Sequence, residues 1–330
     1  SSGGSAVSVS AFECVASLGS DTGGSVRNPA SFCSAVGYKP TYGLISRYGL
    51  ISYANSIEQI GPLTRTVKDS AFMLNLIAGI DTNDNTTVNN NNEDYLANID
   101  SGIEGKRIGI ITEMIGDGID PEVLTATKEA ISKLEGLGAI CEEVSLEMVK
   151  YSVAAYYTIS TTEAGSNLAR YDNLRYGYDF PVEGYEFNSY ISKARRNFGP
   201  EVTRRMIIGG FVPSAGHAGK YFLKAMKVKS KLTKEINEAF KKFDLLIAPT
   251  VPVLPFKIGE KIDDPVSLFL IDINTVTANL TGKPAISIPF KIVNGLPIGI
   301  QLLANSMNDK LLLQAAYALE QTVTLPEVPI

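Results

Sequence analysis

Two periods of hydrophobic and polar residues follow one another along the chain, one typical of strands and one typical of helices. Residues 107–111 form a short β-branched run, and 139–144 form a second one. Between them, apolar residues recur at helical spacing, and Asp120-Pro121 provides a side-chain cap and a first-turn proline. A crossover of this length predicts two parallel strands joined by a right-handed helical connection.

The same patterns predict further elements on either side of this unit. Asn294-Gly295 is a turn signal that joins two strands as a hairpin, whereas the Asn-rich stretch 81–94 has no apolar period and predicts an exposed loop. Helices are expected at 6–18, 66–78, 148–169, 200–243 and 308–321, and strands at 245–248, 285–289 and 297–303. The interleaving predicts an α/β fold with a central mixed β-sheet covered on both faces by helices, in a single domain spanning 1–330.

Composition narrows the class of protein. Of the 330 residues, 45% are hydrophobic and 20% are charged, which allows a sizeable core. The formal net charge is -5 and no basic stripe is present, so a nucleic-acid partner is expected to be held mainly by another subunit. No apolar run reaches the ~20 residues of a membrane span, and no signal peptide is visible.

The cysteines and the single histidine exclude several kinds of site. Three cysteines without a CxxC pair argue against a disulfide framework and a thiolate metal site, and they favour a reducing cytoplasm. His217 is the one histidine of the chain. A Ser-His-Asp triad would need it beside a nucleophile and a carboxylate, and histidine metal sites usually need at least two. We interpret His217 as non-catalytic, and we expect no metal site.

The segment 19–29 is the strongest candidate for chemistry. Gly23 and Gly24 precede Ser25, so successive backbone N–H groups can point into one concavity and stabilise developing negative charge. Ser25 would then be a nucleophile beside its own oxyanion hole. The segment is not a phosphate-binding Walker A loop, because no Gly-Lys-Ser/Thr follows. By spacing alone, a plain Gly-rich turn remains the alternative.

A second small-residue cluster lies at the start of the chain, where the sequence reads Ser1-Ser2-Gly3-Gly4-Ser5. A serine hydroxyl both donates and accepts, so one serine can relay a proton from another to a more distant base.

Together the two clusters resemble the amidase signature family. Its core reads Gly-Ser-Ser-Gly-Gly-Ser and then Gly-Ser-Asp-Thr-Gly-Gly-Ser-Ile-Arg-Pro-Pro-Ala; here 1–5 and 19–30 match, with Val26 and Asn28 as departures. The resemblance covers essentially the whole chain, and the double motif is highly specific. It implies the amidase signature fold. Segments 163–172, 201–205 and 263–272 resemble more specifically the A subunits of glutamyl-tRNA(Gln)/aspartyl-tRNA(Asn) amidotransferases.

The resemblance implies a Ser–cis-Ser–Lys triad. Ser25 matches the nucleophile and Ser1 matches the bridging serine. The chain does not begin with Met, and no lysine in it matches the base, so the catalytic lysine is expected in an upstream segment. The resemblance also assigns the oxyanion-hole loop and a carboxylate that orders it. These positions are Thr22, Gly23, Gly24 and, as the supporting carboxylate, Asp21.

Glutamine is the substrate that the resemblance implies, and its binding residues follow by position. Arg205 is expected to bind the α-carboxylate, since an arginine fork suits a carboxylate, and Asp272 is expected to bind the α-ammonium. Tyr156 matches a pocket tyrosine, although Tyr157 is an alternative. Solvated helix charge for Arg205, a structural cap for Asp272 and ordinary core for Tyr156 also remain open.

The expected function is that of the glutaminase component of a tRNA-dependent amidotransferase. The chain would hydrolyse glutamine through a Ser25 acyl-enzyme and supply ammonia for converting Glu-tRNA(Gln) to Gln-tRNA(Gln). B and C subunits are the implied partners, with tRNA bound mainly by B. No cofactor is expected in this chain, since ATP and Mg²⁺ would belong to the partner. The alternatives are a stand-alone amidase for other small amides and a non-enzymatic scaffold.

Overall fold

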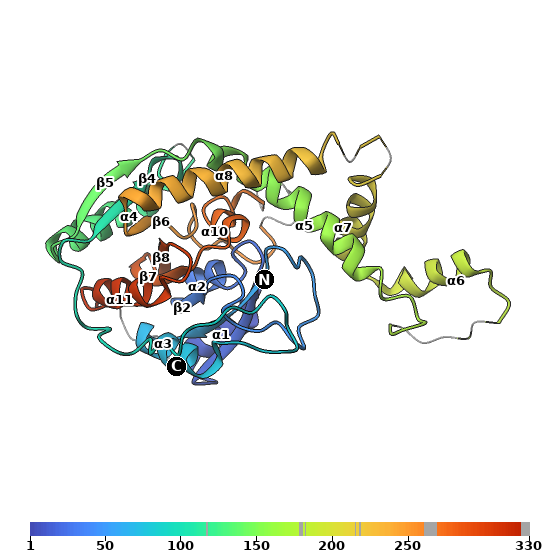
Figure 1. Ribbon diagram of the computed structural model, residues 1–330, viewed down its shortest axis with the longest axis horizontal. Coiled ribbons are helices and arrows are strands. Elements are labelled where there is room, and N and C mark those ends of the chain that lie inside the picture. Colours follow the sequence, from blue (N-terminus) through green and yellow to red (C-terminus); the bar gives the residue numbers. More distant parts are fainter. Residues whose placement is uncertain are drawn as a thin grey trace. The chain divides into compact units, whose positions relative to one another are not determined.

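One mixed sheet of eight strands forms the centre of the fold in the computed structural model, which describes residues 1–116, 118–177, 181, 183–214, 216–217, 219–260 and 269–324 (Figure 1). The strands are β1 (Ala16–Asp21), β2 (Val36–Lys39), β3 (Gln59–Thr64), β4 (Arg107–Ile111), β5 (Ile140–Val144), β6 (Leu245–Pro249), β7 (Ala285–Val293) and β8 (Leu296–Ala304). Their spatial order is β1-β3-β2-β7-β8-β6-β4-β5. Among these strands, β4 pairs in parallel with β5 on one side and with β6 on the other, and the remaining pairs are antiparallel.

Helices and short 3₁₀ turns connect the strands. The α-helices are α1 (Gly3–Ser10), α2 (Arg27–Phe32), α3 (Val67–Ile77), α4 (Pro121–Gly136), α5 (Ser152–Leu168), α6 (Phe187–Ala194), α7 (Pro200–Phe211), α8 (Phe222–Lys242), α10 (Val276–Thr281) and α11 (Asp309–Glu320). The 3₁₀ turns are η1 (Thr112–Met114), η2 (Glu147–Tyr151) and η3 (Arg195–Asn197). The predicted α/β class with a helix-flanked mixed sheet is confirmed.

The predicted strand–helix–strand unit is present as β4–α4–β5. The Asp120 side chain accepts a hydrogen bond from the Glu122 N–H, and Pro121 occupies the first turn of α4. Both features satisfy or remove backbone donors that have no partner inside the helix. β4 and β5 pair in parallel from Arg107↔Ile140 to Ile111↔Val144, as expected for this crossover.

The predicted hairpin is also present. β7 and β8 pair antiparallel, and the turn between them uses Asn294 at φ 52° and Gly295 at φ 79°. Two successive positive φ values are the signature of a hairpin turn whose twist matches that of the strands. The helix predicted at 66–78 is α3, capped by the Thr66 hydroxyl, and 81–94 contains no regular element.

Two predicted helices need correction, and two strands were not predicted. The helix expected at 6–18 ends at Ser10, and its last residues, from Ala16 onwards, belong to the edge strand β1, because small residues satisfy both the 3.6 and the 2.0 period. The helix expected at 200–243 is two helices, α7 and α8. The strands β2 and β3 were not predicted: β2 has four residues, and β3 contains Gly61 and Pro62, which are poor strand formers.

Alternation along β2 shows that helices cover both faces of the sheet. Val36 and Tyr38 belong to the large core that also contains residues of α3, α4 and α11. Gly37 points to the opposite face, where a Cβ would meet Ala30 of α2 at 2.5 Å. Because neighbouring strand residues face opposite sides, α2 lies across the sheet from α3, α4 and α11. Close packing of α2 on the sheet therefore requires a residue without a side chain at 37.

The described chain divides into two compact units. The first comprises Ser1–Leu50, Ile57–Val153 and Lys229–Ile330, and the second comprises Ile51–Ser56 and Ala154–Val228. The sheet belongs to the first unit, and α6 and α7 belong to the second. The single domain expected from the sequence stays a prediction. Among the described helices, none combines the length and apolar character needed to cross a membrane.

Candidate active site

A buried ion pair stands at the base of the Gly-Gly-Ser loop. Asp21 ends β1 and Arg27 begins α2, and both side chains are completely buried. The Arg27 Nε donates to Asp21 Oδ2 at 3.0 Å and Nη2 donates to Oδ1 at 3.0 Å, which makes a bidentate pair. The loop from Thr22 to Val26 is therefore closed at both ends by one charge pair.

Arg27 also ties this loop to segments that are distant in the sequence. Its Nη1 donates to the Thr275 carbonyl at 3.0 Å and to Gln301 Oε1 at 2.5 Å, and its Nη2 donates to Asn279 Oδ1 at 2.6 Å. Asn279 in turn donates to Asp21 Oδ1 at 2.9 Å. Buried charges are tolerated when they are paired and fully hydrogen-bonded, and this network meets both conditions.

The Asp21 carboxylate directs the backbone of the loop. It accepts the N–H of Gly24 at 2.8 Å and that of Val26 at 3.2 Å. The N–H groups of Gly23 and Ser25 make no hydrogen bond within the described part of the chain. Of the predicted oxyanion residues, Gly24 uses its N–H on Asp21, and its role in the oxyanion hole stays a prediction. Gly23 and Ser25 supply the available N–H groups of the loop.

Both the backbone conformation and the space around position 24 require glycine there. Its φ of 132° lies where L-residues with side chains are strained. A Cβ there would also lie 2.3 Å from the Thr275 Oγ1 and 2.8 Å from the Asn28 Nδ2. The Thr275 hydroxyl fixes the same turn by donating to the Gly23 carbonyl at 2.7 Å. Gly24 thus lets the loop approach Thr275 and Asn28 closely.

The small-residue cluster at the start of the chain contacts Ser25 through Ser2. The Ser2 N–H donates to the Ser25 carbonyl at 2.8 Å, and the Ser2 hydroxyl accepts the Ser20 N–H at 3.1 Å. Ser25 itself is half-buried, and Ser1 is exposed. Neither the Ser1 hydroxyl nor the Ser25 hydroxyl is hydrogen-bonded to any residue that the structure describes. The relay from Ser25 to Ser1 stays a prediction.

Two buried titratable groups near the loop have displaced pKa values. Burial alone raises the pKa of Asp21, but the charge and hydrogen bonds of Arg27, with contributions from Lys39 and Asn279, lower it to about 2. Burial and the Arg27 charge lower the pKa of Lys39 to about 7, against the opposing effect of Asp21 and Asp309. The Lys39 Nζ donates to the Pro40 carbonyl at 2.9 Å, and only 1% of the residue is exposed.

Asp272 is in direct contact with the loop region. Its Oδ1 accepts a hydrogen bond from the Asn28 Nδ2 at 2.7 Å, and its backbone carbonyl accepts the Thr275 N–H at 3.0 Å. Asp272 is half-buried, whereas Asn28 is 8% exposed. The first unit therefore places the predicted ammonium ligand one hydrogen bond away from α2. The acidic residues at 263–264 that accompany it in the predicted motif lie outside the described residues.

The other two predicted glutamine ligands belong to the second unit. Arg205 on α7 donates to the Tyr53 hydroxyl at 2.5 Å and to Glu201 Oε1 at 2.6 Å, and it also lies over the Tyr53 ring. Tyr156 on α5 is 5% exposed and makes an edge contact with Tyr157, which is half-buried. The roles of Arg205 and Tyr156 in binding glutamine stay predictions.

Neither a metal centre nor the histidine adds a competing site in the described residues. No group of three or more His, Cys, Asp or Glu side chains there is arranged to hold a metal ion. His217 stacks on Tyr221 with ring centroids 6.1 Å apart, and its Nδ1 lies 3.3 Å from the Ser214 hydroxyl.

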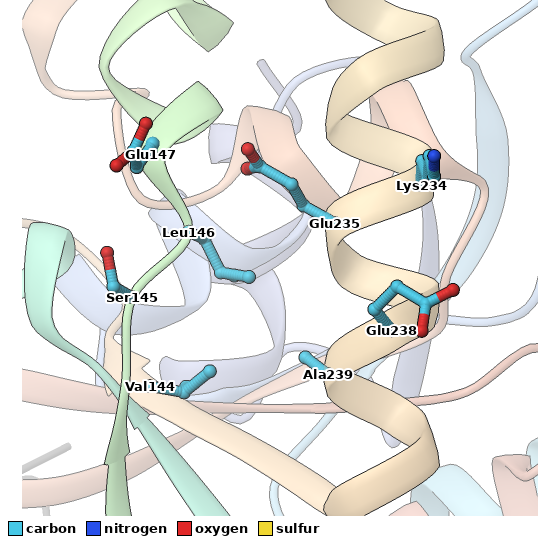
Figure 2. Close-up of a pocket in the computed structure, with 8 residues that line it drawn as sticks. All are labelled: Val144, Ser145, Leu146, Glu147, Lys234, Glu235, Glu238 and Ala239. Atoms are coloured by element: carbon cyan, nitrogen blue, oxygen red, sulfur yellow. The ribbon is translucent and has the colours of Figure 1, made fainter.

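A pocket of about 310 Å³ opens elsewhere in the first unit, between the end of β5 and α8 (Figure 2). The side chains of Val144, Leu146 and Ala239 form its apolar part. The Glu235 carboxylate at its edge accepts the Met148 N–H at 2.9 Å and so has a structural partner. None of the residues predicted for catalysis or glutamine binding lines this pocket.

Comparison with known proteins establishes the family. Residues 1–313 match the family model described as Amidase. The chain belongs to the amidase signature family. The match includes β1, the Gly-Gly-Ser loop, α2 and α10, which together build the Asp21–Arg27 network.

Several relatives of this chain are A subunits of glutamyl-tRNA(Gln) amidotransferase. The chain is 64% identical over 329 residues to the A subunit of glutamyl-tRNA(Gln) amidotransferase from Cenarchaeum symbiosum, covering 100% of this chain and 68% of that protein. It is 49% identical to the protein of the same name from Methanosarcina mazei, covering 97% and 67%. The crystal structure of the A subunit from Thermotoga maritima matches with a TM-score of 0.81 and 45% identity, covering 98% and 66%. The chain thus spans about two thirds of each relative.

Sequence reasoning missed the residues that hold the loop from a distance. Arg27 stands inside the motif, and its position six residues after Asp21 was an available signal. Thr275 and Asn279 reach the loop across 252 and 258 residues. Gln301 lies in the middle of an apolar strand, and a lone amide at such a position is the only local sign of a buried partner.

Proposed function

We propose that this chain is the glutamine-hydrolysing component, the A subunit, of a tRNA-dependent amidotransferase. The observation that carries the proposal is the loop geometry: a buried ion pair fixes a turn in which the Gly23 and Ser25 N–H groups have no partner in the described residues. The names of the relatives support the amidotransferase role over that of a stand-alone amidase. Ser25 is the proposed nucleophile, and its half-buried position suits attack on a small substrate.

The loop supplies the electrostatic part of catalysis. When the Ser25 oxygen attacks the side-chain amide carbon of glutamine, the carbonyl oxygen becomes negative. Backbone N–H groups of Gly23 and Ser25 are proposed to stabilise that oxyanion, and the loss of one such donor typically costs ~10²–10³ in rate. Thr22, which is buried and directly precedes Gly23 in the chain, is proposed to belong to the same oxyanion-binding loop. Asp21 supports the loop and does not take part in proton transfer.

Proton transfer is proposed to run from the Ser25 hydroxyl through Ser1 to a neutral lysine, which acts as general base. The carbon–nitrogen bond then breaks, the proton passes to the leaving nitrogen, and ammonia departs. Water cleaves the Ser25 ester and releases glutamate. Burial keeps a lysine neutral at physiological pH, as the lowered pKa of Lys39 illustrates within this fold. We assign the base to a lysine upstream of residue 1.

Partners complete the proposed reaction. Ammonia passes to a B subunit, which uses ATP and Mg²⁺ to convert Glu-tRNA(Gln) to Gln-tRNA(Gln), and a C subunit completes a heterotrimer in the cytoplasm. The net charge of -5 is consistent with tRNA being bound mainly by the B subunit. No cofactor is assigned to this chain.

Glutamine hydrolysis by the full-length protein in its complex tests the proposal. Ser25→Ala is expected to abolish turnover. Arg205→Ala and Asp272→Ala are each expected to raise KM for glutamine about tenfold or more, since each removes a charge-assisted hydrogen bond. Arg204→Ala is the matched control, because Arg204 is adjacent on α7 and pairs with the same Glu201. Full glutamine turnover in both the Arg205 and Asp272 variants would favour a stand-alone amidase.

A further inference from the structure

Asn28 contacts the two parts of the first unit that the proposed function uses. Its side-chain Nδ2 donates to Asp272 Oδ1 at 2.7 Å, and its backbone N–H donates to the Gly24 carbonyl at 2.7 Å. The same Nδ2 would lie 2.8 Å from a Cβ at Gly24, so the amide is packed directly on the loop. One residue of α2 thus joins the proposed ammonium ligand to the backbone beside the nucleophile.

The N–H group of the Asn28 side-chain amide, and not its carbonyl oxygen, makes the hydrogen bond to Asp272. An ionised carboxylate accepts only, so the Nδ2 side of Asn28 must face Asp272. The opposite atom, Oδ1, is buried and has no hydrogen-bond partner among the described residues. Leaving a buried acceptor unpaired destabilises the folded state. An apolar residue would avoid that cost, so the structural contribution specific to asparagine here is the N–H that it gives to Asp272.

Asp272 lies in the segment before α10 and is half-buried. A hydrogen bond to one carboxylate oxygen restricts the side-chain rotamers and turns the group in a defined direction. The Asn28 amide makes such a hydrogen bond to Asp272 Oδ1.

We propose that Asn28 is a positioning residue that determines specificity for substrates with an α-ammonium group. It holds the Asp272 carboxylate in the orientation that binds the ammonium of glutamine. This inference rests on the proposed function, since it assumes that Asp272 binds that ammonium. Because the Asn28 side chain acts on Asp272, we expect it to affect substrate binding and to leave the chemical step unchanged.

A pair of substrates separates this role from a general effect on the loop. Glutamine and 4-carbamoylbutanoate present the same primary amide and the same carboxylate, but 4-carbamoylbutanoate lacks the α-ammonium group. Both are assayed with the full-length protein in its complex, as wild type, Asn28→Ala and Asn28→Leu. Leucine at this position has nearly the same shape as asparagine, so Asn28→Leu tests the loss of the donor without a large cavity and without a new charge beside Asp272. Ser31→Ala is the matched control, because Ser31 is a buried polar residue of the same helix whose hydroxyl accepts the Gly299 N–H.

In both Asn28 variants, KM for glutamine is expected to rise about 10- to 100-fold, as for the loss of the charge-assisted hydrogen bond between Asp272 and the ammonium group that Asn28 is proposed to orient. The kcat for glutamine and both constants for 4-carbamoylbutanoate are expected to stay within about twofold, and Ser31→Ala is expected to leave the ratio of the two KM values unchanged. Equal losses for both substrates, or no change for either, would overturn the inference alone. A wild-type enzyme that binds the two substrates equally well would overturn the proposed ammonium site, and the inference with it.

Discussion

Two arginine–carboxylate arrangements in this molecule have similar hydrogen-bond lengths but different surroundings. In the first unit, Arg27 and Asp21 are completely buried and joined by bonds of 3.0 Å. In the second unit, Arg204 and Arg205 share Glu201 on α7 at 2.8 and 2.6 Å, and the Glu201 side chain is 52% exposed. Bond length alone would rank the exposed arrangement as the tighter one.

Burial reverses that ranking. Water screens charges at the surface, so exposed pairs contribute about 0–1 kcal/mol. Removing one partner of a buried pair leaves an uncompensated charge in a medium of low polarity, which costs about 3–5 kcal/mol. The Asp21–Arg27 pair also orients the loop that contains Ser25, so its loss affects both folding and the candidate site. The Glu201 pairs affect only their own helix surface and the direction of Arg205.

Arg27→Met is expected to have the largest effect. The substitution keeps much of the side-chain volume but leaves the Asp21 carboxylate buried without its cation, so the free energy of unfolding should fall by about 3–5 kcal/mol. Denaturant-induced unfolding measures this change. Arg204→Met provides the exposed counterpart. A loss below about 1 kcal/mol for Arg27→Met would mean that burial does not distinguish the two arrangements.

Acid unfolding should reveal the Asp21 contribution directly. Because the folded pKa of Asp21 is about 2 and the unfolded value is about 3.9, the pair stabilises the fold above about pH 4, and this contribution is lost as the pH falls towards 2. Asp21→Asn is expected to reduce the pH dependence of unfolding in this window by about 2 kcal/mol. The exposed Asp100→Asn is the control. Identical pH profiles for wild type and Asp21→Asn would contradict the assignment.

Glu201→Gln should have the smallest effect. The change removes the charge that Arg204 and Arg205 share, yet the free energy of unfolding is expected to change by less than about 1 kcal/mol. The remaining difference should shrink further in high salt, because screening acts mainly on exposed charges. Thermal unfolding at low and high ionic strength measures both quantities. A salt-independent loss of several kcal/mol would show that α7 depends on this carboxylate.

The sequence alone was sufficient for the local features of this protein. The cap and proline of α4, the parallel pairing of β4 with β5 and the Asn294-Gly295 hairpin follow from neighbouring residues, whose backbone preferences and periodicity act over a few positions. The paired serine and glycine motifs likewise identified the family, because the loop chemistry lies within one short segment.

Only the tertiary structure decided which groups hold that loop and which N–H groups remain available. Thr275 and Asn279 contact the loop although they lie more than two hundred residues from it in the sequence, so no local pattern predicts these contacts. The use of the Gly24 N–H by Asp21 depends on where one buried carboxylate points. Asn28 was only a departure from a motif until the fold placed Asp272 beside it. Contacts of this kind depend on packing between remote segments, which periodicity and propensity do not encode.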